Sequence, residues 1–335
     1  MAEQRTNENG RPDGRLRVGV LGCADIARRR MLPAMATVPG IEITAVASRD
    51  PAKARAFTDT FGGEPVAGYA AALERDDVDA VYIPLATGLH AEWITRALSA
   101  GKHVLCEKPL VTRYEEAAKA VSLARERGLL LMESFMFLRH SQHARVRELV
   151  ADGAIGTLRS LTADFGIPPL PDGDTRYQRA LGGSALLDVG VYPLRAAQLY
   201  LGSDIRVTGS YLRVDPRRGV DVAGGALLHD EDGVTAHIGF GFVHAYRSRY
   251  ELWGSSGRIG VERAFTPPAG FQPVIRLERQ DVREERTLPA DDQFANIAAE
   301  FADTIAERRD VEPHLEMILR QSALVEEVFT RAARG

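Results

Sequence analysis

Cysteine is nearly absent from this sequence: its 335 residues include only Cys23 and Cys106. Both lie in short apolar runs that have the character of strands. We therefore expect two buried, reduced thiols rather than a disulfide or a zinc site. Reduced thiols are typical of a reducing compartment, so we expect a cytoplasmic protein without a metal site.

Long hydrophobic runs and clusters of one charge are missing as well. No segment has the uninterrupted apolar length of a transmembrane helix, and residues 1–14 lack the apolar core of a secretory signal. We interpret residues 1–14 as a disordered tail. The formal net charge is −4 and there is no long basic run, so we expect neither a nucleic acid polymer nor a membrane as a partner.

What the sequence does contain from residue 15 onwards is a regular alternation of apolar runs with amphipathic segments. This alternation predicts a parallel sheet with helices on both faces, and right-handed crossovers make it a doubly wound, Rossmann-type sheet. The expected strands are 16–22, 41–48, 80–86, 102–109 and 129–135, and the expected helices are 26–38, 50–61, 90–101 and 113–128.

The pattern changes after about residue 135. Residues 141–156 and 182–202 have helical character, the apolar period approaches two beyond residue 205, and helix returns over 294–333. Tight turns at "DEDG" and "SSG" add to the prediction of an α+β domain with a large, mostly antiparallel, open-faced sheet. We therefore divide the chain into a tail (1–14), a dinucleotide-binding domain (15–134) and a substrate and oligomerisation domain (135–335). The last helices are free to pack back on the first domain.

The first predicted strand ends in a glycine directly before a helix, in "VGVLGCADIA". A dinucleotide-binding fingerprint has the spacing Gly-x-Gly-x-x-Gly here, and this chain has Gly22, Ala24 and Ala27 at the three positions. Alanine is tolerated at the third position but departs from the pattern at the second. The alternative is an ordinary strand-to-helix turn. Backbone contacts to a cofactor pyrophosphate are expected from Gly22, Cys23, Ala24, Asp25 and Ile26.

The end of the second predicted strand indicates which dinucleotide is bound. NAD-specific sites place an acidic side chain there for the ribose 2′-hydroxyl, whereas a 2′-phosphate needs a cation. Ser48 offers a hydroxyl, Arg49 a planar guanidinium and Lys53 a further charge. Asp50 precedes a proline and is expected to cap the next helix. We predict NADP(H), against the alternative that Arg49 is a solvated surface residue.

An apolar run ends abruptly in Glu107-Lys108-Pro109, within "HVLCEKPL". Ligands of open α/β sheets bind at the carboxyl ends of the strands, and the proline restricts both its own backbone and that of the lysine. A lysine held in this way is suited to hydrogen-bond a ketone oxygen or to relay a proton. The alternative is a strand-terminal lysine that extends to solvent.

A second group of reactive side chains lies in "GGSALLDVGVYPLRAAQLYLG". Asp188 and Tyr192 are four residues apart and therefore share one face of a helix. A tyrosine donates a proton to a developing alkoxide when a nearby cation lowers the pKa of its phenol, and Lys108 is the candidate for that cation. The alternative is a core tyrosine whose hydroxyl is bonded to Asp188, which this stretch by itself favours.

These motifs together resemble the glucose–fructose oxidoreductase/inositol dehydrogenase (Gfo/Idh/MocA-type) family of NAD(P)-dependent sugar oxidoreductases. The similarity rests on "VGVLGCADIA", "ASRDPAKA", "HVLCEKPL", "GGSALLDVGVYPL", "DGAIGTLRSL" and "YELWGSSGRIGV", and it covers nearly the whole chain after the tail. It implies that Lys108, Asp188 and Tyr192 are catalytic, with a phenol as the proton donor where many members have histidine. Cofactor contacts implied by the family are Leu85, Thr87, His90, Glu107 and Lys108.

Two departures from the family pattern concern substrate binding. Leu138 and Ser141 stand in "FMFLRHSQH" where many relatives have arginine and proline. This block, together with Tyr192, is most similar to the sugar-nucleotide 3-ketoreductases of antibiotic deoxysugar pathways. The substrate-binding residues that this similarity implies are Lys108, Phe137, Arg176, Tyr177, Arg179, Asp188 and Tyr192. The two arginines suit a diphosphate and Tyr177 suits a base, but residues 176–179 are equally interpreted as an ordinary polar loop.

The resemblance thus implies an NADPH-dependent enzyme that reduces the C-3 ketone of a dTDP-linked 4-keto-6-deoxysugar. It also implies homodimers or homotetramers formed through the open face of the second sheet. Three alternatives stay open: a free-sugar or trans-dihydrodiol NADP-dependent dehydrogenase of the same family, a non-catalytic NADP-sensing regulator, and a structural partner subunit. The set of Lys108, Asp188 and Tyr192 argues against a sensor, because a sensor has no need of a proton donor.

Overall fold

Residues 14–335 are described by a computed structural model, and the predicted tail lies outside these residues except for Gly14. The chain forms two compact units. Among the described residues, unit 1 contains 14–111, 115–136 and 294–319, and unit 2 contains 112–114, 137–293 and 320–335. The units are thus discontinuous, unlike the predicted ranges 15–134 and 135–335. One reason is that Leu315 and Ile318 belong to the hydrophobic core of unit 1.

Unit 1 is built on a six-stranded parallel sheet with the strand order β3-β2-β1-β4-β5-β6. This is the order of a doubly wound dinucleotide-binding sheet, in which ligands lie beyond the carboxyl ends of the strands where the order reverses. The strands are β1 (Leu16–Leu21), β2 (Ile41–Ser48), β3 (Glu64–Ala67), β4 (Ala80–Ile83), β5 (His103–Glu107) and β6 (Leu131–Ser134).

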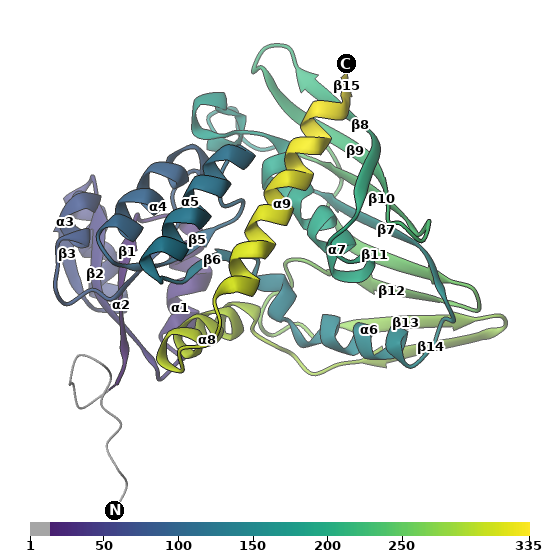
Figure 1. Ribbon diagram of the computed structural model, residues 1–335, viewed down its shortest axis with the longest axis horizontal. Coiled ribbons are helices and arrows are strands. Elements are labelled where there is room, and N and C mark those ends of the chain that lie inside the picture. The colour runs from purple at the N-terminus through teal and green to yellow at the C-terminus, as the bar shows by residue number, and fades with distance from the viewer. Residues whose placement is uncertain (1–13) are drawn as a thin grey trace, which may run out of the picture. The chain divides into compact units, whose positions relative to one another are not determined.

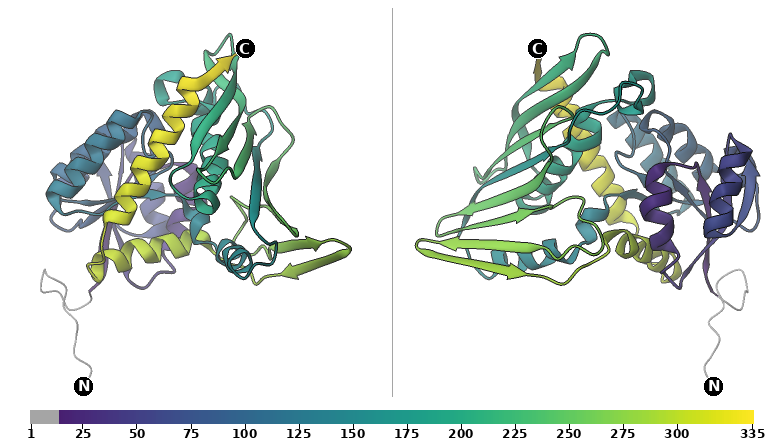
Figure 2. Two further views of the ribbon diagram at one scale, coloured as in Figure 1. Left: turned by 45° about the vertical axis from the view of Figure 1, so that its right-hand side comes forward. Right: turned by 180° about the vertical axis from the view of Figure 1, so that it is seen from behind.

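Helices cover both faces of this sheet, with α3, α4 and α5 on one face and α1 and α2 on the other (Figures 1 and 2). On the first face Val81, Ile83 and Val104 of the sheet are fully buried in one core with Ile94 and Ala97. The helices that contribute to unit 1 are α1 (Leu32–Met35), α2 (Pro51–Phe61), α3 (Tyr69–Leu73), α4 (His90–Ser99), α5 (Tyr114–Arg127), α8 (Gln293–Ala306) and the first part of α9 (Glu312–Arg331).

Unit 2 is built on a nine-stranded sheet with the order β14-β13-β12-β11-β7-β10-β9-β8-β15. Its neighbours pair antiparallel except β7 with β10 and β8 with β15, which are parallel. The strands are β7 (Leu158–Gly166), β8 (Arg206–Asp215), β9 (Val220–His229), β10 (Thr235–Gly241), β11 (Arg247–Gly254), β12 (Arg258–Glu262), β13 (Val274–Arg279), β14 (Val282–Thr287) and β15 (Ala332–Arg334).

One face of the nine-stranded sheet packs against helices α6 (Ser141–Ala151) and α7 (Val191–Leu201). Strand residues of that face, such as Leu161, Tyr250 and Leu252, are almost completely buried. In the right-hand view of Figure 2 the strands lie in front of these helices, and within the described chain no helix covers the other face. The two sheets confirm the predicted fold class, including the open face of the second sheet.

Two predicted helices differ from the structure. The stretch predicted to be helical over 294–333 consists of two helices, because α8 ends at Ala306 and α9 begins at Glu312, and its last residues form β15. Arg308 adopts a left-handed φ of 52°, which is incompatible with a continuing helix. The helix predicted over 26–38 is a π-helical turn (Ala27–Met31) followed by the four residues of α1.

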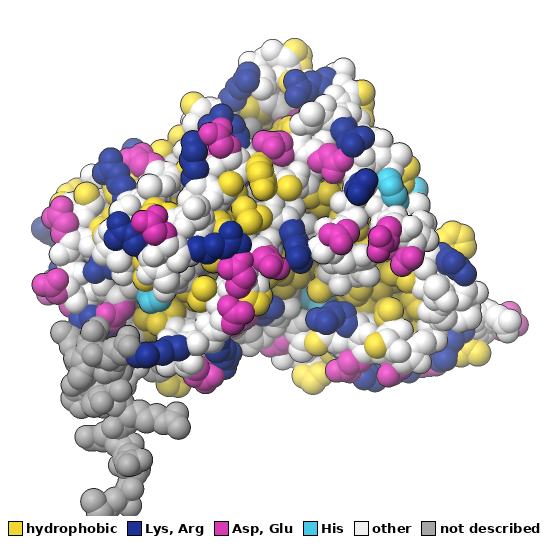
Figure 3. All heavy atoms as spheres, viewed as in Figure 1, with side chains coloured by type: hydrophobic (Ala, Val, Ile, Leu, Met, Phe, Trp, Pro, Cys, Tyr) yellow, Lys and Arg dark blue, Asp and Glu magenta, His cyan; other side chains and the backbone are white. Residues whose placement is uncertain are grey.

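Surface charge is mixed over the face seen in Figure 3, where Lys and Arg side chains are interspersed with Asp and Glu. No helix within residues 14–335 is both long enough and apolar enough to cross a membrane. In the same part of the chain no cluster of three or more His, Cys, Asp or Glu side chains is arranged to hold a metal ion. Cys23 and Cys106 are free thiols.

Candidate active site

The turn after β1 accepts only glycine at its first position. Gly22 has a φ of 120° and its amide donates to Ala47 O on β2 at 2.9 Å. A Cβ atom at Gly22 would lie 2.7 Å from Leu85 Cδ2, so a larger residue would collide with the loop after β4. The predicted phosphate turn is therefore in contact with Leu85, for which the family resemblance implies a contact with the cofactor.

The residues that follow Gly22 begin the first helical turn of unit 1. Cys23 is half-buried, and burial raises the pKa of its thiol. Asp25 is exposed and its carboxylate is paired with Arg28 at 2.9 Å and Arg29 at 2.5 Å. The two guanidinium groups neutralise the negative charge of the Asp25 carboxylate, which lies in a turn that is expected to approach a pyrophosphate.

At the end of β2 the one carboxylate of the loop and its two cations have different surroundings. The Asp50 carboxylate caps α2 by accepting from the amides of Ala52 at 2.9 Å and Lys53 at 3.5 Å, which confirms the predicted cap. Ser48 is buried and its Oγ accepts from the Asp50 amide at 3.1 Å. Arg49 and Lys53 are exposed. The single carboxylate of this loop is thus occupied by the helix, and two cations are left at the surface.

Three residues that the family resemblance implied in cofactor binding lie between the end of β4 and the first residue of α4. Leu85 and Thr87 are half-buried, whereas His90 is 1% exposed. Both ring nitrogens of His90 lie within 3.1 Å of backbone carbonyl oxygens. The structure therefore places this ring in the interior of unit 1, where it contacts backbone rather than a surface ligand.

Residues 108–110, which we call the lysine turn, follow β5 directly, and the Lys108–Pro109 peptide bond is cis. Lys108 is half-buried. Its neighbour Glu107 is 7% exposed and accepts a hydrogen bond from Tyr82 Oη at 2.7 Å, and burial raises the pKa of the Glu107 carboxyl. The family resemblance placed Glu107 at the cofactor, but the structure places its carboxylate among the strands of the sheet.

In unit 2 the predicted helix begins as a π-helical turn (Leu186–Gly190) that carries Asp188 and then continues into α7, which carries Tyr192. Single π-turns are frequent at functional sites. The turn is anchored by Asp221 of β9, whose carboxylate accepts from the Leu186 amide at 2.8 Å. Burial raises the pKa of Asp221. Asp221 was not predicted, although a lone acidic residue in the apolar run "GVDVAGG" was a signal for it.

Tyr192 is 3% exposed and lies in a cluster of aromatic rings. Its ring centroid is 5.7 Å from that of Phe137, 5.2 Å from that of Phe165 and 5.7 Å from that of Phe265. Phe137 itself is fully buried and packs against Tyr192 within this cluster of rings, whereas the resemblance implied a contact with the substrate. Phe165 and Phe265 were not predicted, because ring contacts between segments that are distant in the sequence leave no local pattern.

The loop before the π-turn holds the residues predicted to meet a diphosphate. Arg176 donates through Nε to Asp188 Oδ2 at 2.6 Å, and this carboxylate keeps the pKa of Arg176 raised. Arg179 is exposed. Tyr177 is buried, with the guanidinium of Arg218 lying 4.1 Å above its ring. The ring that was predicted to stack on a base is therefore covered in the structure.

A buried polar chain runs behind the aromatic cluster. His143 Nε2 lies 3.0 Å from Ala264 O, which can only accept, so Nε2 carries the hydrogen. Nδ1 then accepts from Tyr250 Oη at 3.0 Å, and Tyr250 Oη lies 2.7 Å from Tyr200 Oη. Burial lowers the pKa of His143 to about 3. The ring of His143 also packs on Phe137 at 5.3 Å, which connects this chain to the tyrosine cluster.

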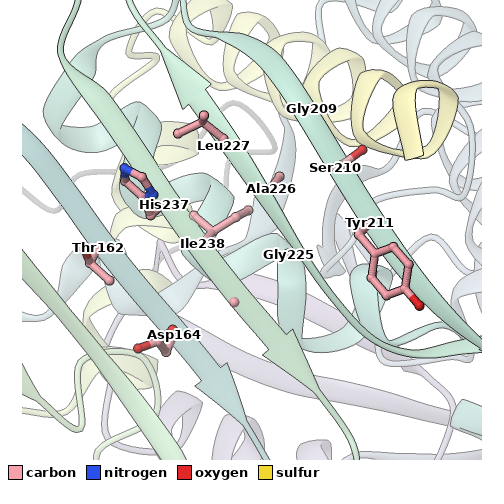
Figure 4. A pocket seen from close by; sticks show the side chains of 11 residues that line it. Thr162, Asp164, Gly209, Ser210, Tyr211, Gly225, Ala226, Leu227, His237 and Ile238 are labelled. Atoms are coloured by element: carbon pink, nitrogen blue, oxygen red, sulfur yellow. The ribbon is translucent and has the colours of Figure 1, made fainter. Parts of the chain in front are cut away.

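A separate hollow of about 450 Å³ lies on the sheet of unit 2. Figure 4 shows its lining on four neighbouring strands, with Asp164 and His237 on two of them and the exposed Tyr211 on β8. Three of its lining residues, Gly209, Gly225 and Gly239, contribute no side chain. None of the predicted site residues lines it.

The structure thus brings the predicted residues together in two groups. Gly22, Leu85, His90 and the Lys108 turn form one group in unit 1, linked by the packing of Gly22 on Leu85 and by the contacts of the His90 ring nitrogens with the carbonyl oxygens of Leu85 and Pro109. Asp188, Arg176 and Tyr192 belong to unit 2, with Asp188 paired to Arg176. The predicted approach of Lys108 to Tyr192 involves both units and stays a prediction.

Two family models match this chain. Residues 16–135 match the oxidoreductase family with an NAD-binding Rossmann fold, and residues 143–260 match the C-terminal domain of the GFO/IDH/MocA proteins. The first matched range contains all six strands of the unit 1 sheet, and the second matched range lies within unit 2.

Known relatives resemble nearly the whole chain. A dTDP-3,4-didehydro-2,6-dideoxy-α-D-glucose 3-reductase of Actinomadura kijaniata is 55% identical over 317 residues, which are 95% of this chain and 96% of the relative. A D-xylose 1-dehydrogenase (NADP⁺) of Haloferax volcanii is 35% identical over 94% of this chain and 98% of the relative. A solved 3-ketoreductase from Actinomadura kijaniata, in complex with NADP and TDP-benzene, covers 96% of this chain and 98% of its own with a TM-score of 0.94 and 55% identity.

Proposed function

Because the chain belongs to the GFO/IDH/MocA oxidoreductase family, we propose that it is an NADPH-dependent 3-ketoreductase of a dTDP-linked 4-keto-6-deoxysugar. The observation that carries this proposal is the 55% identity, over nearly the full length of both chains, to a reductase of that substrate class. Three further relatives with the same activity are 49–56% identical. We infer that unit 1 binds the cofactor and that unit 2 binds the sugar nucleotide.

The residues of unit 1 fit NADP(H). Gly22 brings backbone amides to the expected pyrophosphate position without a side chain in the way. Arg49 and Lys53 supply positive charge for the 2′-phosphate. The Asp50 carboxylate caps α2 and is therefore not directed at the ribose 2′ position. The solved 3-ketoreductase at 55% identity was crystallised with NADP, in agreement with this assignment.

NADPH supplies a hydride when it is bound, and the protein has to position the ketone and deliver a proton. In our proposal the Lys108 ammonium hydrogen-bonds the C-3 ketone oxygen and stabilises the charge that develops on it. The Tyr192 phenol gives its proton to the new alkoxide. Asp188, paired with Arg176, orients the substrate hydroxyls, and Arg176 and Arg179 present cations to the diphosphate.

Variant structures of the relative from Actinomadura kijaniata support the choice of two residues. One replaces a lysine and another a tyrosine, and these two positions are as far apart in that chain as Lys108 and Tyr192 are in this one. The coincidence is expected when two chains align without gaps between the two positions. We therefore assign the proton donor and the ketone-binding cation to Tyr192 and Lys108.

The proposed function is tested by mixing the purified protein with NADPH and dTDP-3,4-didehydro-2,6-dideoxyglucose generated enzymatically. We expect NADPH absorbance to fall as a product with a C-3 alcohol accumulates, and we expect NADH to support a much lower rate. No turnover of this substrate, with NADP⁺ reduced by free xylose instead, would assign the protein to the sugar dehydrogenase activity of its 35% identical relative. Inactivity on both, with NADPH still bound, would favour a sensor.

We also propose that a second copy of the chain covers the open face of the unit 2 sheet. Two large aromatic side chains of this sheet are exposed, namely Trp253 of β11 at 63% and Tyr211 of β8 at 49%. The hollow lined by the three glycine residues would admit side chains of the partner. In sedimentation experiments the protein is expected to be a dimer or tetramer, and Trp253→Glu is expected to shift it towards the monomer.

We further propose that the protein is located in the cytoplasm. Its two cysteines are free thiols, which agrees with a reducing compartment.

A further inference from the structure

His90 has a position that its predicted contact with the cofactor does not explain. It is the first residue of α4 and only 1% of its surface is exposed. Nε2 lies 2.9 Å from Leu85 O, and Nδ1 lies 3.0 Å from Pro109 O and 3.1 Å from Leu110 O. All three atoms are backbone carbonyl oxygens, which can only accept hydrogen bonds.

These carbonyls belong to the two segments from which the proposed site of unit 1 is built. Leu85 is in the loop after β4 and forms the wall against which Gly22 packs. Pro109 and Leu110 follow Lys108 directly. The ring of His90 therefore joins the phosphate turn and the Leu85 loop on one edge to the lysine turn on the other.

The lysine turn is also anchored to the strands beside it. The Leu110 amide donates to Glu133 Oε1 on β6 at 2.7 Å, and Glu107 accepts from Tyr82 of β4 at 2.7 Å. These bonds fix the turn to the sheet, but neither of them involves the Leu85 loop. The ring of His90 supplies that connection, because it contacts carbonyl oxygens of both segments.

Burial and the nearby Lys108 ammonium lower the pKa of His90, while the three carbonyls raise it, and burial has the largest effect. A neutral ring donates through one nitrogen at a time, and a protonated ring donates through both. In either state the rigid ring lies between the two segments. Leucine at this position keeps a similar volume but donates no hydrogen bond, and glutamine keeps one donor group on a flexible chain.

We propose that His90 is a positioning residue that holds the Leu85 loop and the Lys108 turn in the arrangement that cofactor binding and ketone reduction require. The effect on ketone reduction rests on the proposed function, whereas the effect on cofactor binding does not. Displacing a reacting group by about 1 Å can cost about 100-fold in rate. The role of His90 is thus exerted through backbone and not by contact with the substrate.

The test compares His90→Leu and His90→Gln with the control His103→Leu. His103 is a half-buried histidine at the opposite end of β5, where its Nδ1 accepts from the Leu130 amide at 3.0 Å. NADPH affinity is measured by fluorescence titration, and kcat and KM are measured with the keto-sugar. For His90→Leu we expect about tenfold weaker NADPH binding and a kcat lowered about 10- to 100-fold, with the keto-sugar KM changed less than about threefold.

His90→Gln is expected to recover part of both losses. His103→Leu is expected to keep NADPH affinity and kcat within about twofold of the wild type, although it loses stability through its unpaired amide. Equal losses in His90→Leu and His103→Leu, or NADPH binding unchanged in His90→Leu, would overturn the proposal. If the wild type does not reduce the keto-sugar at all, the proposed function fails, and NADPH affinity still decides the role of His90.

Discussion

Tyr192→Phe is expected to lower kcat for reduction of the keto-sugar by about 10²–10⁴-fold, the usual loss when one acid–base group is removed. The substitution deletes only the hydroxyl. The ring keeps its contacts with Phe137, Phe165 and Phe265, so the cluster and the fold stay intact. The dissociation constant of NADPH is expected to change by less than about twofold. Steady-state kinetics and fluorescence titration measure the two quantities on the same preparation.

Tyr200→Phe is the matched control for this substitution. Tyr200 lies on the same helix, α7, and its hydroxyl is bonded to Tyr250 rather than placed for chemistry. It is expected to lose about 1 kcal/mol of stability and to keep kcat. Lys108→Met is expected to lower kcat as strongly as Tyr192→Phe. Wild-type turnover in both Tyr192→Phe and Lys108→Met would show that neither residue takes part in catalysis.

Unit 2 is expected to lose about 2 kcal/mol of stability between pH 7 and pH 5 because of His143 alone. The pKa of His143 is about 3 in the folded protein and about 6.5 in the unfolded chain, so the unfolded chain binds the proton more tightly. The contribution is fully present above pH 6.5 and is lost progressively as the pH falls from there towards 3. A proton on Nδ1 of His143 would turn this atom into a donor, so it could no longer accept the hydrogen bond from Tyr250 Oη.

Hydrogen exchange of the β11 amides, which belong to unit 2, measures this loss at a series of pH values after correction for intrinsic rates. His143→Gln removes the titrating imidazole. Between pH 7 and pH 5 this variant is therefore expected to lose about 2 kcal/mol less stability than the wild type, whatever its stability at pH 7. His237→Gln, an exposed histidine of the same unit, is expected to keep the wild-type dependence. The same dependence in His143→Gln and in the wild type would contradict the prediction.

Some elements of the fold follow from short stretches of sequence because their causes are local. An apolar run such as that of β1, which only Arg17 interrupts, is typical of a strand buried on both faces, and all six residues of β1 are buried. Asp50 before Pro51 is a helix cap because the side chain reaches the next free amides. The strand β3 (Glu64–Ala67) was not predicted, since it is short, contains a proline and has no fully buried residue.

The sequence by itself determined the two types of sheet, the glycine turn at Gly22 and the Asp50 cap beside Arg49, and it supplied Lys108, Asp188 and Tyr192 as candidate residues. Only the tertiary structure decided what surrounds them: His90 against the carbonyls beside Leu85 and Lys108, Asp221 beneath the π-turn, and the rings around Tyr192. Local patterns report backbone preference and burial, which depend on neighbours in the chain. Partners that approach from other strands depend on how distant segments pack, and no short stretch of sequence carries that information.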